Sequence, residues 1–294
     1  MNNSHKRILF LLPLLFACAC IAGTVIDLSQ RPTDARIAAM GNAGVAVPGE
    51  LGTNNPAGLA GMTRRIHASS AVSSLYGSAD LLEWCGGVPL GQGMVAMGFT
   101  GLQVGNIPEV QETNGRPEVL SMFGSIKNIF SASYAWPWGE QLGWGVTLKY
   151  HTQQLFNASA SGIAMDLGLL WSSEVSIGMV LRNLVAAPMT WSTGHQDDFP
   201  RTGTLGVSHT LHGWGQECLT ALDVDLQPSR TPVWHVGMEY KPVPAFAFRA
   251  GSDDGQLTMG VGLNYANFRI DYAYLPHSEL GESYKASFLY CFSQ

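Results

Sequence analysis

Histidine and carboxylate side chains are the residues of this sequence that could bind a metal ion or transfer a proton. His195, His209 and His212 lie in or beside an expected loop and turn, without Cys or carboxylate neighbours at the spacing of metal ligands. Asp223 and Asp225 share one face of a strand, like the acidic pairs of some membrane proteases, but no His or Ser partner is evident from the sequence. We therefore expect a hydrated acidic pair, and no catalytic residue, metal site, cofactor or enzyme activity.

The charge balance argues against nucleic acid as a partner. Charged residues make up 13% of the 294-residue chain, and its formal net charge of -6 becomes -8 if Lys6 and Arg7 leave with an export leader. Phosphate binding requires a basic face or a Gly-rich phosphate loop, and the sequence shows neither. A soluble domain usually carries about 25% charged residues, so this composition, with 34 glycines, favours a different class of protein.

Much of the sequence alternates with a period of two, and several charged residues follow this pattern. Between Leu257 and Tyr265, and again between Phe268 and Tyr274, large apolar residues alternate with small or polar ones, which is strand periodicity. An aromatic-rich face opposite a polar face suits a barrel wall between lipid and a wet lumen. A soluble sandwich would alternate as well, so the alternation alone does not decide. On the polar face, in mid-strand, lie Lys149, Asp166, Asp223, Asp225, Glu239, Arg269 and Asp271.

The runs bounded by turn residues number about fourteen, and an even number is expected of a bacterial outer-membrane barrel. Residues 104–127 and 186–201 are the longest connections, and they would face outward if both termini are periplasmic. For the last strand we expect Tyr284, Ala286, Phe288, Tyr290 and Phe292 to face lipid, and Lys285, Ser287 and Cys291 to face the lumen. The expected strands are 66–76, 81–88, 93–103, 128–136, 142–154, 160–171, 175–185, 202–211, 217–226, 233–241, 246–252, 257–265, 267–275 and 284–292. The sequence thus predicts an all-β fold, a transmembrane antiparallel β-barrel over residues 66–294.

Residues 1–23 have the features of a signal peptide. Lys6 and Arg7 precede an apolar run over residues 8–16, and small residues follow up to residue 23, where we expect cleavage. The run is too short to span a bilayer, and no later apolar run reaches the roughly 18 residues of a membrane helix. An uncleaved anchor and lipidation at Cys18 are the alternatives. We expect the exported chain in the bacterial outer membrane, with outer-membrane lipid and the barrel-assembly machinery as partners.

Three cysteines remain after such a cleavage, and we expect ordinary wall residues. Their number is odd, and they have neither the paired spacing of a zinc site nor the density of a disulfide scaffold. They are Cys85, Cys218 and Cys291.

The segment between the leader and the first strand, residues 24–65, does not have the pattern of wall. Thr33 is the expected N-cap of a short helix that runs through Met40 and ends at Gly41. We expect Arg36 in this helix to find an acidic partner in the lumen, because an unpaired buried guanidinium is costly. The segment is rich in small residues and buries little apolar area by itself, so it should be ordered only if the barrel surrounds it.

Residues 54–59 read Asn-Asn-Pro-Ala-Gly-Leu, in which Asn before Pro favours a tight turn and Gly58 permits close approach of the backbone. Taken alone, an ordinary surface turn ahead of the first strand explains this motif. However, ARIAAMGNAGVAV at residues 35–47, NPAGLA at residues 55–60 and FRIDYAYLPHSELGESYKASFLYCF at residues 268–292 resemble the PorV/PorQ family of outer-membrane proteins, which is related to the FadL-type transporters of hydrophobic compounds. The two ends frame almost the whole mature chain, and the middle matches only in strand pattern.

The resemblance implies a barrel of about fourteen strands whose N-terminal segment folds into the lumen as a plug, seated with the help of Asn55, Pro56 and Ala57. In FadL-type transporters this arrangement carries hydrophobic solutes toward a lateral opening, whereas PorV-like members serve type IX secretion as partners of exported proteins. The chain departs from the family pattern at residues 48–52, where Pro-Gly-Glu-Leu-Gly replaces the usual acidic run. Long outer loops are also lacking, which puts a deep ligand cup in doubt.

Two functions remain open on this basis. One is the passage or binding of hydrophobic small molecules through a plugged lumen. The other is a non-enzymatic accessory role in type IX secretion, in which the barrel binds exported proteins as cargo. A membrane enzyme is a third hypothesis, for which the sequence offers no catalytic residues. An apolar cavity beneath the plug would favour solute passage, and a filled lumen would favour a platform for partner proteins.

Overall fold

A computed structural model describes residues 28, 34–51, 54–62, 64–113, 116–213, 215–228 and 230–292. The expected signal peptide and its cleavage site lie outside the described residues. In the described part of the chain, no helix is long and apolar enough to cross a bilayer.

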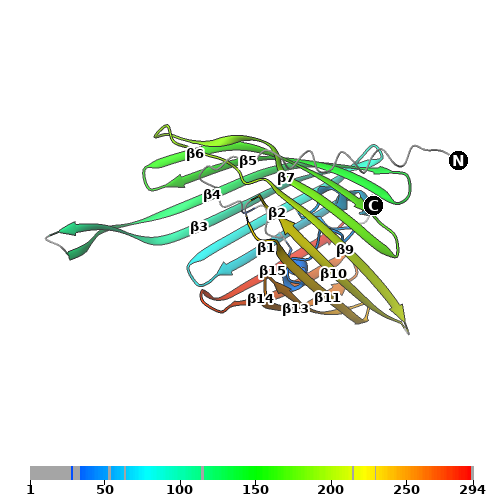
Figure 1. Cartoon of the computed structure of the whole chain (residues 1–294). Coiled ribbons are helices and arrows are strands. Elements are labelled where there is room, and N and C mark those ends of the chain that lie inside the picture. Colours follow the sequence, from blue (N-terminus) through cyan, green and yellow to red (C-terminus); the bar gives the residue numbers. More distant parts are fainter. Residues whose placement is uncertain are drawn as a thin grey trace.

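Antiparallel strands, most of them paired with the next along the chain, build a closed barrel (Figure 1). The first strand pairs with the last, β1 with β15, and the pairing of β6 with β7 completes the ring. Among the described residues, fourteen long strands form the wall, and the two-residue β8 (Gln196–Asp197) pairs only with β7. The wall strands are β1 (His67–Leu75), β2 (Ala79–Leu90), β3 (Gly93–Thr113), β4 (Arg116–Trp138), β5 (Leu142–Leu155), β6 (Ala158–Trp171), β7 (Val175–Trp191), β9 (Thr202–Gly213), β10 (Gln216–Leu226), β11 (Val233–Val243), β12 (Phe246–Asp253), β13 (Gln256–Tyr265), β14 (Phe268–His277) and β15 (Gly281–Cys291). The even-numbered closed wall confirms the predicted fold class.

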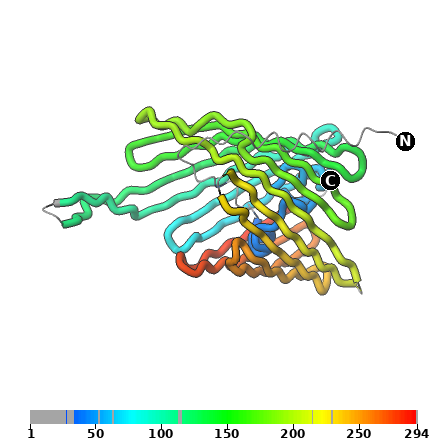
Figure 2. The backbone as a smooth tube through the Cα atoms, in the orientation of Figure 1, coloured from blue at the N-terminus to red at the C-terminus, as the bar shows by residue number. Residues whose placement is uncertain are grey.

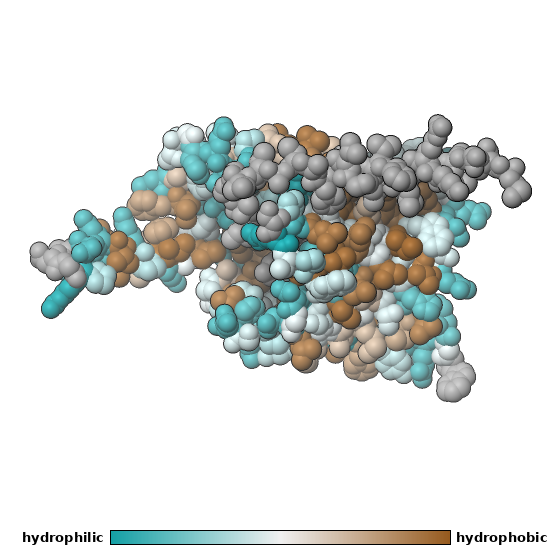
Figure 3. Space-filling view, in the orientation of Figure 1, coloured by the Kyte–Doolittle hydropathy of each residue, from teal (hydrophilic) through white to brown (hydrophobic). Residues whose placement is uncertain are grey.

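The two faces of the wall carry the side chains that the alternation predicts. On β15, Tyr284 and Phe288 are exposed, whereas Lys285 and Ser287 are buried on the inner side. Apolar side chains are visible over the outer wall (Figure 3). The charged residues that the sequence places on the inner face and that are buried there are Lys149, Asp166, Asp223, Glu239 and Asp271. A closed wall that exposes apolar side chains and encloses charged ones fits a lipid bilayer.

Residues 104–127 are mostly strand, so the expectation of a loop is wrong. The neighbouring strands β2 and β5 stop pairing at Val104 of β3 and Ser125 of β4. Beyond these pairs, residues 105–113 and 116–124 pair with each other alone within the described chain, and they project from the barrel (Figure 1). We call this two-stranded projection the free ribbon. Two register shifts at and within the ribbon interrupt the period of two, which hides the strands from a pattern search.

The expected connection at residues 186–201 is also partly strand. β7 continues to Trp191 along β6, although its last pair with β9 is at Arg182. The rest of the connection folds back, so that β8 pairs with Met189 and Thr190. Phe199 is buried in a cluster with Met189, so this loop covers part of the lumen at the end from which the ribbon projects. We call that end the hairpin end, and the opposite end, where the chain leaves β15, the terminal end.

The described part of the N-terminal segment lies inside the wall (Figure 2). Its described residues 34–51 and 54–62, called the lumen segment below, contain α1 (Ala35–Ala39) and the 3₁₀ helix η4 (Pro56–Gly61). The N-cap of α1 is Asp34, which has extended backbone angles and accepts a hydrogen bond of 2.7 Å from the backbone N–H of Arg36. The prediction of Thr33 as N-cap is therefore wrong, because the helix begins one residue later; Thr33 itself lies outside the described residues.

Candidate functional site: the lumen and the segment inside it

Glycines of the wall let the lumen segment pack backbone against backbone. A Cβ atom added to Gly237 or Gly251 would collide with the backbone of Met40 and its neighbour, and one added to Gly145 or Gly168 would collide with Pro56 or the residue before it. Side chains at these four positions would therefore push the lumen segment away from the wall. We call these four wall glycines the glycine seat of the lumen segment.

Side chains of the wall satisfy the polar backbone groups of the lumen segment. Thr258 on β13 donates to the carbonyl of Ala39 (2.9 Å) and accepts from the N–H of Gly41 (3.0 Å). Asp223 on β10 accepts from two consecutive N–H groups, those of Gly44 and Val45, at 2.8 Å each. Because buried backbone groups without partners are costly, these bonds explain how a segment with little regular structure stays inside the barrel.

Arg36 is the centre of the ionic contacts between segment and wall. Its guanidinium binds Glu239 of β11 through two nitrogens, with Nε to Oε2 at 2.8 Å and Nη2 to Oε1 at 2.7 Å. The third nitrogen, Nη1, forms an ion pair with Glu50 of the lumen segment itself. The expected acidic partner of Arg36 in the lumen is thus Glu239, and the bidentate geometry is the strong form of this pair.

The ion pairs continue around the wall beyond Arg36. Arg249 on β12 joins Glu239 (Nε to Oε2, 2.6 Å) to Asp271 on β14 (Nη1 to Oδ1, 2.8 Å). Arg269 on β14 contacts Asp271 (2.9 Å), Glu50 (3.2 Å) and Asp34. Alternating charges of this kind offset the cost of taking each ion out of water, whereas removing one member leaves a buried charge unpaired.

Asp34 belongs to this network, and its neighbours there lower the pKa of its carboxyl group. Burial alone would raise the pKa of Asp34, but the Arg269 guanidinium and the backbone N–H of Arg36 lower that pKa from 3.8 to about 2. Asp34 also accepts a hydrogen bond from Ser287 of β15 (3.0 Å), whose hydroxyl in turn accepts from the N–H of Ala35 (3.1 Å). The start of α1 is therefore held to two wall strands, β14 and β15.

Asn55 forms a second anchor, at the β5–β6 side of the lumen. Its side-chain amide donates to the carbonyls of Val45 (2.8 Å) and Leu169 of β6 (3.1 Å), and its oxygen accepts from the N–H of Ala57 (3.0 Å). Pro56 follows as the first residue of η4 and packs against the wall glycines. Asn55 thus joins two parts of the lumen segment to each other and to the wall.

The sequence-predicted site residues occupy two separate places in the lumen. Arg36 lies at the β11–β14 side, whereas Asn55, Pro56, Ala57 and Gly58 lie together at the β4–β6 side, all four of them buried. Gly58 does not need to be glycine for close packing, because a Cβ there would lie 3.8 Å from its nearest neighbours. The close approaches that exclude a side chain are at the wall glycines instead. Sequence analysis missed those, although the alternation already put several of them on the inner face.

The histidines and the expected acidic pair serve the barrel in other ways. Asp223 is buried and binds the lumen segment, so the expectation of a hydrated residue is wrong for Asp223. Asp225 lies 3.4 Å from Nε2 of His235, whose Nδ1 is 2.9 Å from Asp253. His195 contacts Asp197 in the β7–β9 loop at 3.0 Å. Among the described residues, no group of three or more His, Cys, Asp or Glu side chains is arranged to hold a metal ion.

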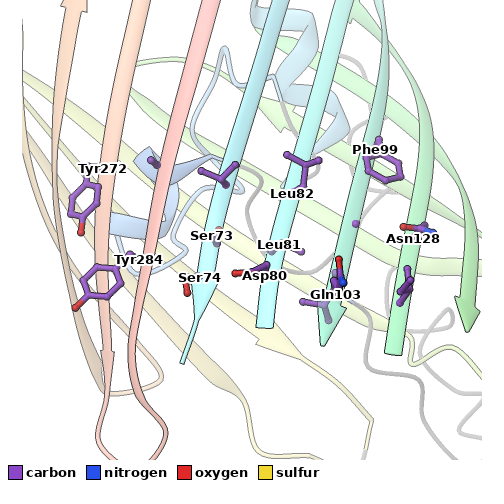
Figure 4. Close-up of a pocket in the computed structure, with 15 residues that line it drawn as sticks. Ser73, Ser74, Asp80, Leu81, Leu82, Phe99, Gln103, Asn128, Tyr272 and Tyr284 are labelled. Carbon is purple, nitrogen blue, oxygen red and sulfur yellow. The ribbon is translucent and has the colours of Figure 1, made fainter. Parts of the chain in front are cut away.

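Of the hollows in the described part of the chain, one lies in the lumen and another on the outer face of the wall. The lumen pocket, of about 280 Å³, lies at the hairpin end between α1 and the inner wall. Its lining combines apolar side chains, among them Ala38, Leu75 and Leu81, with polar and charged ones such as Asp253 and Lys285. The outer hollow, of about 580 Å³, is lined mainly by outward-facing side chains of β14, β15 and β1–β4. Figure 4 shows the side chains around the outer hollow, among them Leu82, Phe99, Asn128, Tyr272 and Tyr284.

No family model matches the chain, and no curated protein matches it. Solved structures do resemble it. The monoaromatic hydrocarbon channel CymD superimposes with a TM-score of 0.62 at 12% identity, over 89% of this chain and 98% of that channel. The TodX monoaromatic hydrocarbon channel is similar: its deltaS2 mutant has a TM-score of 0.57 at 12% identity over 88% and 98% of the two chains, and its deltaS2S3 mutant 0.53 at 12% over 81% and 92%.

This likeness concerns the fold, and it spans nearly the whole of both chains. With the apolar outer wall and the closed ring, it identifies the protein as an outer-membrane β-barrel with a channel-like fold. The bacterial outer membrane is accordingly its location.

Proposed function

We propose that the protein binds hydrophobic small molecules and passes them across the outer membrane through a barrel whose lumen segment moves to admit them. The observation that carries this proposal is the position of the lumen pocket, which has α1 as one of its walls. CymD and TodX, which share the fold, are described as monoaromatic hydrocarbon channels. The two ends of the chain resemble the PorV/PorQ family, whose FadL-type relatives carry hydrophobic solutes.

The contacts of the lumen segment suit a reversible plug. Within the described residues, hydrogen bonds, ion pairs and close backbone packing hold it, and none of these is covalent. A molecule in the lumen pocket contacts the wall at Leu75 and Leu81 and the segment at Ala38 and Asn42. If that molecule prefers the arrangement in which α1 has shifted, its binding moves the equilibrium toward an open lumen.

Binding of toluene and palmitate to the purified barrel in detergent tests this proposal. We expect saturable binding of at least one probe. Leu75→Trp fills the lumen pocket from the inner face of β1 and should raise the dissociation constant about tenfold or more, since a pocket of this size has no room for both the indole and the probe. Leu82→Trp, on the outer face of the neighbouring strand β2, lines only the outer hollow; it is the control and should bind as the parent does. If neither probe binds saturably, the proposal fails. If only Leu82→Trp loses binding, the site is the outer hollow and the lumen is not the route.

An accessory role in protein secretion is the second candidate, and two features favour it. The lumen segment fills much of the lumen, and the free ribbon extends beyond the wall (Figure 1). Most side chains of the ribbon are exposed. A barrel that only conducts solutes has no evident use for such a ribbon. In this role the barrel binds exported proteins, as PorV-like members of the resembling family do.

A further inference from the structure

The free ribbon consists of two strands that have no wall beside them. The neighbours end at the pairs of Ala79 with Val104 and of Leu155 with Ser125. Beyond these pairs, the described residues give the ribbon no further strand partner on either side. Backbone N–H and C=O groups along both outer edges therefore point away from the ribbon, which is the usual template for the addition of a strand.

Apolar side chains of the ribbon are exposed to a degree that is unusual outside lipid. The exposed fractions are 54% for Val110, 58% for Val119, 56% for Leu120 and 62% for Met122. An isolated two-stranded hairpin is at best marginally stable in water, and contiguous exposed apolar groups mark interaction sites. The ribbon thus has both a backbone edge and an apolar surface that a partner would cover.

The base of the ribbon is fixed to the barrel. The ring of Phe123 lies 5.2 Å from that of Phe156, which is in the β5–β6 turn, measured between ring centroids. Register shifts between Val104 and Ile107 and between Glu109 and Val110 bend the strands. Shifts of this kind are found where proteins re-aim a strand, so the ribbon is presented in a set direction.

The ribbon carries negative charge, which selects among partners. Glu109, Glu112 and Glu118 stand against one cation, Arg116, so that the net charge of the described ribbon is -2. Two copies of the ribbon would repel each other, and like charges on paired strands are destabilising. Carboxylates at these positions also keep the ribbon out of lipid, where charged side chains are costly.

We propose that the free ribbon docks an extended segment of another protein, in which basic and apolar residues alternate, and takes it up as a third strand. Main-chain hydrogen bonds along an outer edge of the ribbon hold the segment as an added strand. The apolar residues of the segment cover Val110, Val119 and Met122, and its basic residues pair with the glutamates. This proposal deepens the second candidate function, because it names the chemistry of the exported partner. It makes no use of the lumen.

The test measures binding of a fluorescent peptide of alternating Lys and Val, nine residues long, to the full-length barrel in nanodiscs. We expect saturable binding that weakens with salt, and a dissociation constant at least tenfold weaker for the ribbon variant Glu109→Lys/Glu112→Lys/Glu118→Lys. The control variant Glu140→Lys/Glu174→Lys/Glu279→Lys makes the same change of charge at exposed residues outside the ribbon and should bind as the parent does. A peptide that is N-methylated at every residue keeps its charges but has no N–H to donate along either edge, and it should lose binding.

Three results would overturn the proposal: equal binding by the ribbon and control variants, equal binding of the N-methylated peptide, or equal binding to empty nanodiscs. Toluene binding by the ribbon variant separates this test from the first candidate function. That binding should be unchanged, so a failed docking test leaves solute passage standing. A failed toluene test, conversely, leaves the docking proposal standing.

Discussion

The lumen segment and the free ribbon are both additions to the same wall, and they differ in where their polar backbone finds partners. The lumen segment has little regular structure, and wall side chains such as Thr258 and Asp223 bind its N–H and C=O groups one by one. The free ribbon is regular, and within the described chain its two strands pair only with each other. The segment is thus ordered by the barrel. The ribbon is ordered by its own pairing, and the backbone groups along its outer edges are left for a partner.

The comparison also explains the composition of the two regions. Small residues dominate the lumen segment because its backbone touches wall glycines, as Met40 does at Gly237. The ribbon instead carries valines, glutamates and a methionine, whose side chains lie in the open. The lumen segment is thus buried and has small side chains, whereas the free ribbon has larger side chains that are exposed.

Filling the glycine seat should separate the lumen segment from the wall, which is the largest effect we expect. In Gly237→Leu/Gly251→Leu, the new side chains meet the backbone of Met40, which has no room to move aside. Overpacking costs about 1 to 3 kcal/mol at each site. Trypsin should then cut after Arg36, the only Lys or Arg between residues 34 and 62, in the variant and not in the parent. Gly105→Leu/Gly213→Leu adds the same two side chains to open space and should leave Arg36 protected.

Removing the charge of Arg36 should loosen the segment without releasing it fully. Arg36→Leu leaves Glu239 with Arg249 and Lys241 as its cations. Breaking a buried ion pair from one side costs about 3 kcal/mol, so amide hydrogen exchange over residues 37–47 should accelerate about a hundredfold. Arg36→Lys keeps the charge but loses the two-nitrogen contact and should fall in between. Unchanged exchange in Arg36→Leu would mean that the network does not hold the segment.

Acidification should weaken the binding of the lumen segment to the wall over the pH range in which Asp34 becomes protonated. Because its pKa is lowered from 3.8 to about 2, ionised Asp34 stabilises the seated state above about pH 4, and this stabilisation of about 2 kcal/mol is lost as pH falls toward 2. Pepsin, active in this range, should cut the lumen segment increasingly as pH falls. Asp34→Asn keeps an N-cap without charge, and it should be cut more at pH 4 and respond less below it. Other carboxylates titrate in both proteins, so the difference between the two curves isolates Asp34.

Removing the ribbon should have the smallest effect on the barrel. Replacement of residues 106–123 by Asn-Gly, a favoured two-residue hairpin turn, shortens β3 and β4 to the height of their neighbours. We expect the unfolding free energy in urea to change by less than about 0.5 kcal/mol and Arg36 to stay protected from trypsin. A large loss of stability would show that the ribbon supports the wall and is not an appended docking element.

Period-two alternation was enough to predict the wall from the sequence, and it was not enough for the regions that depart from it. The predicted faces of β13, and of β15 between Tyr284 and Phe288, are confirmed because exposure alternates from one residue to the next there. The outer halves of β3 and β4 were missed, since register shifts break the period and residues such as Pro108 and Asn106 are typical of loops.

The site could be predicted only in part, for a related reason. The need of Arg36 for an acid follows from the cost of a buried guanidinium, so a partner in the lumen was foreseeable. Which acid it would be, and that Asp223 would bind two backbone N–H groups, depends on how the segment lies against the wall. A single sequence carries no direct record of that placement. Glycines on the inner face, such as Gly145 and Gly237, were its one visible trace.

Conductance in planar bilayers tests most directly whether the lumen segment closes the barrel. Asn55→Ala/Pro56→Ala removes the hydrogen bonds to Val45 and Leu169 and the packing of Pro56, while every wall strand stays intact. We predict a closed or very small conductance for the parent and a larger, noisier one for the double variant, with both folded by circular dichroism. A parent that already conducts like an open porin, or a double variant that cannot be told from the parent, would contradict the account.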